Sequence, residues 1–401
     1  MDYGIKDEGI ICFAGEDWWY HHPHSKRHIM TRFSRDNKVI FVNSLTLGLP
    51  SIGNRDFFLK IRRKLKSYMR WLKRAPEGPY VMTPVIVPFF GSSAIRAFNR
   101  VLLSLQMRLA MKIVGIERPI VWVAIPSAVD IAERLNAKII LYQVSDKYDA
   151  NEDSALSRCV IQDMDARLKK ISDIVMYSGR KLFDESDVPH RYFLEQAVDF
   201  DHFATVAPHT ARDIASIPRP ILCYMGWMDY IMDVPLIEEV AKRRPQWHWV
   251  FIGNKSNLVQ ISAPNVHFLG SKPYSELPSY VRQADVFVLP WRISNEFTSY
   301  GSAIKVREYM ATGKPVVIAP LHEYLETPGL RIYRTPGEFI VAVEDALKND
   351  APRDAALRQS FVKAGTWDVR TQQLGRLIAG LLAGKKFVHA VEPEEALTVN
   401  Q

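Results

Sequence analysis

The chain has 401 residues, of which 47% are hydrophobic and 24% charged; this composition excludes disordered and fibrous classes, and the length favours two domains. The formal net charge is +8. Residues 55–118 carry fourteen Lys/Arg against three acidic residues, and this segment therefore supplies the whole positive excess, which indicates a binding surface.

The sequence shows neither a membrane span nor a secretory signal. No apolar run approaches the roughly 18 residues that cross a bilayer, and Glu16 and Asp17 stand where a signal peptide would be apolar. We therefore expect a cytoplasmic location. The cysteines, Cys12, Cys159 and Cys223, lack C-x-x-C spacing and are predicted to be buried, reduced thiols.

Hydrophobic periodicity predicts two successive runs of alternating strands and helices. In the first run we expect strands at 9–14, 38–43, 80–84, 120–124, 138–143 and 174–177, with helices at 25–34, 55–74, 93–114, 127–135 and 157–172. The pattern lapses over 203–220. In the second run we expect strands at 221–226, 247–253, 266–269, 286–290 and 315–319, with helices at 234–242, 274–283 and 302–312.

This alternation predicts an α/β protein with two Rossmann-like, doubly wound domains that face each other across a cleft. The expected boundaries are a first domain over 1–205, a second domain over 206–370, and a C-terminal helix and tail over 371–401 that packs back toward the first domain.

The most specific stretch runs from a buried strand ending at Trp291 into a helix that opens at Gly301 or Ser302. Amides of the first turn, around Ser302 and Ala303, can hold a diphosphate. Lys305 can reach phosphate oxygens, and Glu308, on the same face, suits the paired hydroxyls of a ribose. The alternative is a solvated Lys/Glu pair on a surface helix.

Together with Tyr224-Met-Gly226, Phe251-Ile-Gly-Asn254 and the segment 265–278, this stretch resembles the C-terminal donor domain of GT-B glycosyltransferases. It is most similar to the branch of bacterial exopolysaccharide and teichuronic acid assembly that carries Lys-x-x-Glu-Tyr-Met-Ala-x-Gly-Lys-Pro-Val-Val. The resemblance implies a nucleotide-sugar as substrate, with UDP as the expected nucleotide, and no cofactor. It also implies a donor site that includes Gly226, Trp227, Gly253 and Tyr274.

The sequence departs from this pattern at one position of mechanistic weight. Many relatives carry a Glu-x7-Glu pair here, whereas Tyr300 stands eight residues before Glu308. Gly226 is also followed by Trp227 instead of a basic pair. The choice between an inverting and a retaining reaction therefore stays open.

For the acceptor half, an inverting transfer needs a base at the edge of the sheet. Asp146 follows the predicted strand 138–143, and its Ser-Asp neighbourhood resembles that of xanthan-type glucuronosyltransferases, where the Asp is the proposed base. A cap or turn is the alternative role. Asp17 and His24 are expected to shape the acceptor pocket, with a plain surface loop as the alternative.

No metal site is expected. The histidines around His24 lie on a Pro-bearing loop whose spacing fits no common metal site. Asp163-Met-Asp165 matches an Asp-x-Asp motif, but it falls within a predicted helix, and we interpret it as solvated surface.

The segment Arg55 to Arg74 predicts a helix with an apolar stripe framed by cations. Such a helix can lie on an anionic membrane or bind a lipid-diphosphate acceptor; a nucleic-acid surface, which we do not favour, and a solvated face are the alternatives. The helix expected at 93–114 repeats the pattern with fewer charges, or belongs to the core.

These features together predict a metal-independent hexosyltransferase, peripherally bound to the inner face of the cell membrane. It would move a sugar from a UDP-type donor to a lipid-diphosphate-linked or amphipathic glycan in surface polysaccharide synthesis. Arg292 and Lys272 leave room for an acidic sugar such as glucuronate. A nucleotide-sugar epimerase of the same fold and a catalytically silent assembly subunit are the alternatives.

Overall fold

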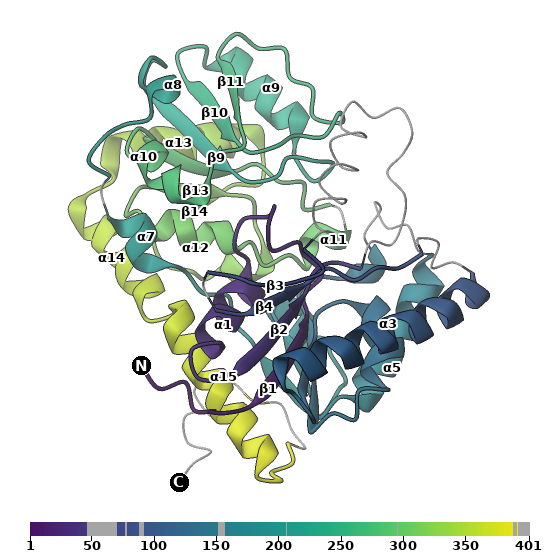
Figure 1. Ribbon diagram of the computed structural model, residues 1–401. Helices are drawn as coiled ribbons and strands as arrows, with labels where there is room; N and C mark the ends of the chain where they lie inside the picture. Colours follow the sequence, from purple (N-terminus) through teal and green to yellow (C-terminus); the bar gives the residue numbers. More distant parts are fainter. Residues whose placement is uncertain are drawn as a thin grey trace. The chain divides into compact units, whose positions relative to one another are not determined.

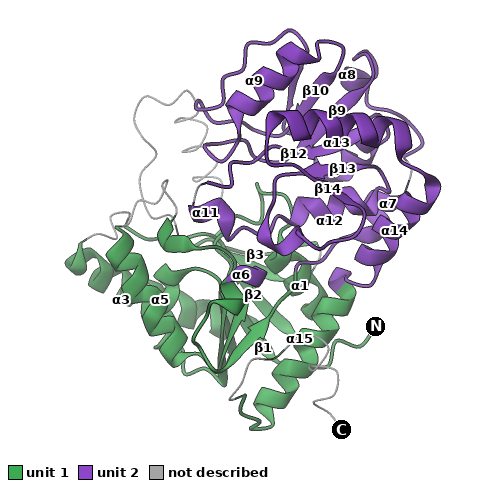
Figure 2. Cartoon of the chain, turned by 180° about the vertical axis from the view of Figure 1, so that it is seen from behind, with its two compact units in different colours: residues 1–178, 182–195, 368–401 green, residues 179–181, 196–367 purple. Residues whose placement is uncertain are grey.

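The computed structural model describes residues 1–45, 70–76, 78–87, 92–150, 157–205, 207–294, 296–387 and 391. The chain forms two compact units (Figure 2). Unit 1 comprises Met1–Ser178, Leu182–Glu195 and Asp368–Gln401, and unit 2 comprises Gly179–Lys181 and Gln196–Trp367.

Unit 1 is built on an eight-stranded sheet in the order β3-β4-β2-β1-β5-β6-β7-β8 (Figure 1). Its strands are β1 (Gly9–Phe13), β2 (Lys38–Val42), β3 (Leu72–Arg74), β4 (Tyr80–Met82), β5 (Ile120–Val123), β6 (Ile139–Val144), β7 (Ile174–Tyr177) and β8 (Arg191–Phe193). All neighbours are parallel except β3 and β4. The central strands are continuous apolar runs because helices cover both faces.

The longer helices of unit 1 are α1 (Ser25–Phe33), α3 (Ser93–Val114), α5 (Arg158–Ile171) and α15 (Trp367–Leu382). Its short helical elements are η1 (Pro126–Ala128), α4 (Val129–Ala132), η2 (Tyr148–Ala150) and α6 (Arg180–Asp184). The first two residues of α6 are assigned to unit 2 and the rest to unit 1. Figures 1 and 2 both show α3 and α5 on one side of the sheet and α1 with α15 on the other. None of the helices in the described part of the chain has the length and hydropathy of a membrane span.

Unit 2 contains a six-stranded parallel sheet in the order β11-β10-β9-β12-β13-β14. Its strands are β9 (Ile221–Met225), β10 (His248–Ile252), β11 (Val266–Gly270), β12 (Val286–Leu289), β13 (Val316–Ile318) and β14 (Leu330–Ile332). Counted along the unit, this is the 3-2-1-4-5-6 order of a dinucleotide-binding sheet. The strand order reverses between the first and fourth strands, here β9 and β12, which run parallel.

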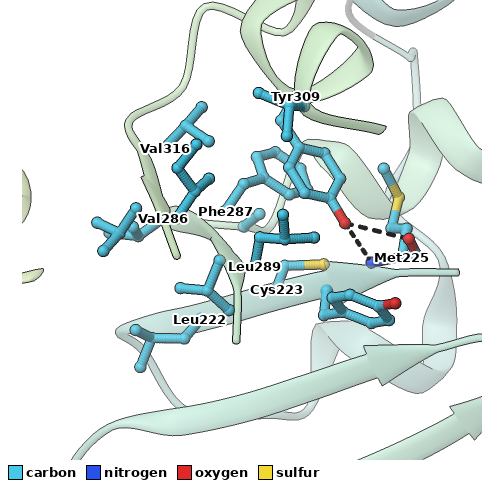
Figure 3. Packing of buried hydrophobic residues seen from close by; sticks show 14 of the residues in the cluster. Leu222, Cys223, Met225, Val286, Phe287, Leu289, Tyr309 and Val316 are labelled. Carbon is cyan, nitrogen blue, oxygen red and sulfur yellow. Dashed lines mark hydrogen bonds between the residues drawn. The ribbon is translucent and has the colours of Figure 1, made fainter. Parts of the chain in front are cut away.

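The helices of unit 2 are α7 (Phe200–Ala204), α8 (Arg212–Ala215), α9 (Val234–Arg243), η3 (Tyr274–Glu276), α10 (Leu277–Val281), α11 (Glu296–Ser299), α12 (Ile304–Ala311), η4 (His322–Tyr324), α13 (Pro336–Asn349) and α14 (Pro352–Lys363). Figure 3 shows how the core fixes α12 on the sheet: the Tyr309 hydroxyl accepts a hydrogen bond from the Met225 N–H and donates one to the Met225 carbonyl, at 2.8 and 3.1 Å. The Tyr309 ring stacks on Phe287 with centroids 4.5 Å apart.

The predicted elements are found, with several corrections. Residues 55–69 of the predicted basic helix lie outside the described residues, while its end forms β3, in which Leu72 pairs with Met82. Cys12 and Cys223 are buried free thiols, but Cys159 is exposed because it stands in the first, solvent-facing turn of α5.

The division between the units also differs from the expected boundaries. Residues 196–205 belong to unit 2 because Val198 forms a bridge with Thr366 and α7 packs on α12. Residues 368–401 belong to unit 1. There Asp368 accepts hydrogen bonds from the Tyr3 hydroxyl and, at 2.8 Å, from Arg32.

Candidate functional site

The candidate donor site of unit 2 lies at the point where the strand order reverses, between β9 and β12. Gly226 follows β9, Gly253 follows β10 and Trp291 follows β12, so all three leave the carboxyl edge of neighbouring strands. In open α/β sheets, ligands bind in the crevice at this point.

Lys305 stands at the centre of this edge. Its ammonium donates a hydrogen bond of 3.0 Å to the Tyr224 hydroxyl and lies 4.6 Å from the centre of the Trp291 ring. The Glu308 carboxyl, on the same helix, interacts with this ammonium electrostatically, but no carboxylate in the described part of the chain lies within ion-pair distance of it.

 Lys305 is therefore positioned by aromatic groups, and its charge remains available to an anion.

Gly226 has a backbone conformation that favours glycine, and its loop lies close to Lys305. Gly226 has φ +143, and a Cβ there would lie 2.8 Å from the Lys305 Nζ. At Gly253, which has φ +146, a Cβ would lie 2.0 Å from the Gly226 carbonyl oxygen. The two loops therefore pack backbone against backbone, and the side chain of Trp227 is left 52% exposed at the rim.

The start of α12 differs from the expected one. The helix begins at Ile304, with Ala303 at the N-cap and no side-chain hydrogen bond, so Lys305 stands in the first turn and not one turn further along. Ala303 is buried, and its carbonyl accepts a 2.9 Å hydrogen bond from the Tyr324 hydroxyl. Since an alanine cannot cap the first-turn amides, these N–H groups suit an anionic ligand beside the half-buried Ser302.

Glu308 is a half-buried carboxyl on the same helix. Burial raises its pKa to about 7, while the neighbouring Lys305 lowers it and Asp199 raises it further. Protonated and ionised forms are therefore both accessible near neutral pH, and either can accept a hydrogen bond from a hydroxyl group.

Three other predicted residues have local partners. Tyr274 lies in η3, after a strand two places from β9, and its ring stacks on His202 with centroids 4.2 Å apart. The Tyr300 ring lies 4.2 Å from the Lys181 ammonium, so the residue that replaces the first acid of the usual pair attracts a cation. Lys272 forms an ion pair of 2.5 Å with Asp213.

The candidate acceptor residue, Asp146, lies just after β6 in unit 1. Its carboxyl is half-buried, and burial raises its pKa, whereas the Lys26 ammonium lowers it. The loop around it is fixed by Tyr148, whose hydroxyl donates to the Ala124 carbonyl at 2.9 Å and accepts from the Ser145 N–H at 3.3 Å. This environment suits a carboxylate that must take up a proton.

Glu16 is a residue of this edge that the sequence interpretation missed. It follows β1, two strands from β6, and is 7% exposed. Burial raises its pKa to about 7 against the lowering influence of Lys26 and Arg27. Within the described residues its Oε1 atom has no hydrogen-bond partner, and neither do the buried hydroxyls of Ser127 and Ser145 at the same carboxyl edge. Its place directly after the first strand was the available signal.

Asp17 and His24 have local roles in the structure. The Asp17 carboxylate accepts a 2.9 Å hydrogen bond from the Trp19 N–H, which closes a turn, and the Asp17 N–H donates to His21 Nδ1 at 3.2 Å. His24 is the N-cap residue of α1 but makes no side-chain cap there.

The Asp-x-Asp motif is only partly solvated surface. Asp163 is exposed, but Asp165 is half-buried because it accepts a 2.6 Å hydrogen bond from the Tyr142 hydroxyl and pairs with Lys169 at 2.6 Å. Among the described residues, no group of three or more His, Cys, Asp or Glu side chains is arranged to hold a metal ion.

Comparisons with known proteins agree with this geometry. Residues 220–349 match the family of group 1 glycosyl transferases. The chain is 24% identical, over 64% of its length and 71% of the relative's, to a protein of Bacillus subtilis (strain 168) named as the teichuronic acid biosynthesis glycosyltransferase TuaH.

Solved structures share the fold across both units. The sucrose-phosphate synthase of Thermosynechococcus elongatus has a TM-score of 0.68 at 12% identity, covering 95% of this chain and 100% of its own. Anabaena Alr3699/HepE, solved in complex with UDP and glucose, has a TM-score of 0.64 at 11% identity, covering 94% and 100%.

Proposed function

We propose that this chain, a glycosyltransferase of the GT-B fold with a group 1 domain over residues 220–349, transfers a sugar from a UDP-type donor to a lipid-linked or amphipathic glycan. Unit 2 would bind the donor through Lys305 and Glu308, and Asp146 of unit 1 would serve as the base. The proposed setting is surface or exopolysaccharide synthesis at the inner face of the cell membrane.

The main support for donor binding by unit 2 is the position of the Lys305 ammonium. Tyr224 and Trp291 hold it at the carboxyl edge of the sheet, where the strand order reverses between β9 and β12. When the bond between the anomeric carbon and the diphosphate breaks, negative charge grows on the leaving diphosphate. Lys305 and the first-turn amides of α12 supply positive charge there, preorganised and partly shielded from water. A relative of the same fold that binds UDP and glucose supports this nucleotide.

In the acceptor half, the hydroxyl oxygen of the acceptor forms the new bond to the anomeric carbon. Its proton passes to the Asp146 carboxylate, and the nucleoside diphosphate leaves with the electrons of the broken bond. The raised pKa of Asp146 makes it a stronger base than an exposed aspartate. Glu16, buried two strands away with a free carboxylate oxygen, would orient an acceptor hydroxyl by accepting a hydrogen bond.

The proposed class of acceptor is supported by the similarity to a protein named for teichuronic acid biosynthesis. An acidic donor sugar such as glucuronate has weaker support, since Lys272 is paired with Asp213 and only the exposed Arg292 remains of the two cations first considered.

The test is UDP release from a panel of UDP-sugars, with and without a membrane extract as the source of acceptor. A transferase releases UDP with one donor only when the acceptor is present. An epimerase converts the donor without acceptor and releases no UDP, and a silent subunit binds UDP without turnover. Either of the last two results would refute the proposal.

A further inference from the structure

The long helix α3 of unit 1 has one face that packs on the rest of the unit. The helix is capped at its start by the Ser92 hydroxyl, which accepts from the Ile95 N–H, and ends at Gly115 in the left-handed conformation with φ 75. At 22 residues it is about 33 Å long. The buried side chains are Asn99, Leu103, Met107, Ala110, Met111 and Val114.

The opposite face of α3 carries a stripe of exposed apolar side chains, which we call the α3 stripe: Phe98, Val101, Leu105, Leu109 and Ile113. Each is between 51% and 58% exposed. The spacings of three or four residues place them along one side of the helix. Single exposed apolar residues are ordinary, but an unbroken row over four turns marks an interaction site.

Cations accompany the α3 stripe. The helix contains Arg96, Arg100, Arg108 and Lys112 and no acidic residue. Arg108 and Lys112 are exposed and alternate with Leu105, Leu109 and Ile113 along the outer side. In the described part of the chain, neither of these two cations takes part in an ion pair.

We infer that the α3 stripe is a docking surface for an anionic lipid bilayer. The apolar side chains would enter the boundary between headgroups and acyl chains, and the cations would contact the phosphates. Arg and Lys stems are long enough to keep their charged ends at the headgroups while the helix lies in the plane of the surface.

The charges favour a membrane over other occupants. A second copy of α3 would bring cations opposite cations, because the helix has no acid to pair with them. A nucleic acid would gain from the cations but would leave the apolar stripe exposed, and four of its five side chains are aliphatic and offer no ring for base stacking.

This inference deepens the proposed function, since an enzyme on the bilayer surface meets a lipid-linked acceptor in two dimensions. It does not depend on the transfer chemistry. The stripe also differs from the segment Arg55 to Arg74, most of which lies outside the described residues.

The experiment is co-sedimentation of the full chain with vesicles of phosphatidylcholine, with and without phosphatidylglycerol. We expect binding that requires phosphatidylglycerol. Replacing both cations (Arg108→Gln with Lys112→Gln) should lower the partition coefficient about thirtyfold. Replacing two stripe residues (Leu105→Gln with Leu109→Gln) should lower it by at least as much.

The matched control lies on α13, where Val341 is an exposed apolar residue and Lys348 an exposed cation. The double variant Val341→Gln with Lys348→Gln should bind vesicles like the parent. Equal thermal midpoints of all variants would show that folding is intact, as expected for exposed positions.

Two results would overturn the inference. One is vesicle binding that is absent, or unchanged in the α3 variants. The other is a dimer, by analytical ultracentrifugation, that the Leu105 and Leu109 changes dissociate while vesicle binding persists. UDP affinity, measured without vesicles, separates this inference from the proposed function: intact UDP binding and transfer with no vesicle binding would remove only the docking surface.

Discussion

At the scale of single residues, the donor site depends on one ammonium group. We predict that Lys305→Ala weakens UDP binding about 10- to 100-fold, the range for losing a charge-assisted hydrogen bond to phosphate. Isothermal titration calorimetry measures it. Lys242→Ala, an exposed lysine on α9, is the control and should leave the affinity unchanged. Equal affinity of the two variants would exclude Lys305 from the site.

Glu308 couples donor binding to stability. Its pKa is about 7 in the folded chain, against an ordinary value of 4.5. The folded state therefore retains a proton that the unfolded state loses, and the free energy of unfolding falls as pH rises through this interval. Glu308→Gln should remove the effect and stabilise the chain in alkaline buffer by about 2 kcal/mol, with little change in acid.

The same substitution should weaken UDP binding about tenfold, because an amide accepts a ribose hydrogen bond less strongly than a carboxylate. Urea denaturation at several pH values and calorimetry test the two halves of this prediction. A pH-independent difference between Glu308→Gln and the parent would contradict the first half.

Asp146 should set the acid limb of the pH–rate profile. Only the carboxylate can accept the proton, and burial raises its pKa, so kcat/KM should decline with acidity at a higher pH than for an exposed aspartate. Lys26 lowers this pKa, and Lys26→Met should therefore move the limb further upward. UDP affinity, a property of unit 2, should stay constant.

Asp146→Asn should reduce transfer about a hundredfold or more while UDP still binds. An acid limb that stays in place in Lys26→Met would leave Asp146 a structural residue.

Part of the candidate donor and acceptor sites could be predicted from the sequence. Lys305 and Glu308 lie in one contiguous motif on one helix face, and such spacing is visible in a sequence. Tyr224 lies near the end of β9, Trp291 follows β12 and Glu16 follows β1, so their partners can be identified only once the strand order is known. Their burial, which raises the pKa of Glu16 and positions Lys305, is a property of the fold alone.

At the scale of elements, the donor loops depend on two glycines in contact. A Cβ at Gly253 would lie 2.0 Å from the Gly226 carbonyl oxygen, and φ +146 is unfavourable for any other residue. Gly253→Ala should therefore lower the free energy of unfolding by about 1–3 kcal/mol and weaken UDP binding, because the Gly226 loop must move away from Lys305.

Gly337→Ala is the matched control for that change. Gly337 lies in α13, where a Cβ would meet only the Thr335 hydroxyl at 3.9 Å, so the alanine should be neutral or stabilising. Urea denaturation of both variants is the measurement, and an equal effect of the two would show that the loop contact is unimportant.

Elements with strong periodicity were predictable to within a few residues, as for α3 and β7. The three-residue strands β3, β8 and β14 were missed because each is short and includes a Lys or Arg, unlike the equally short but apolar β4 and β13, which were predicted. The sequence also could not predict which face of α3 is buried, because apolar residues cover more than one face of this helix. The packing shows that Leu103 and Met107 face the core while Leu105 and Leu109 face outward.

At the scale of the whole molecule, most of unit 2 is one continuous stretch, Gln196–Trp367, inserted between two parts of unit 1, and Gly179–Lys181 also belong to unit 2. The alternation of strands and helices predicted two sheets. It could not show that 196–205 belong to the second, because that assignment rests on the bridge between Val198 and Thr366, far apart in sequence.

The return of α15 to unit 1 depends on a close contact at its middle. A Cβ at Gly375 would lie 1.6 Å from the carbonyl oxygen of Tyr3, so the helix and the N-terminal segment can meet only through glycine. Gly375→Ala must therefore displace one of them, together with the bonds of Asp368 to Tyr3 and Arg32. We expect a loss of about 1–3 kcal/mol in the stability of unit 1.

Hydrogen exchange followed by mass spectrometry locates this effect. Amides of α15 and α1 should exchange faster in Gly375→Ala, whereas those of β9 and β12, in unit 2, should keep their protection, and UDP affinity should be unchanged. Gly337→Ala again serves as the control, with parental exchange in α15. Uniformly faster exchange across both sheets would instead mean that the two units unfold as one cooperative structure and that α15 stabilises the whole chain.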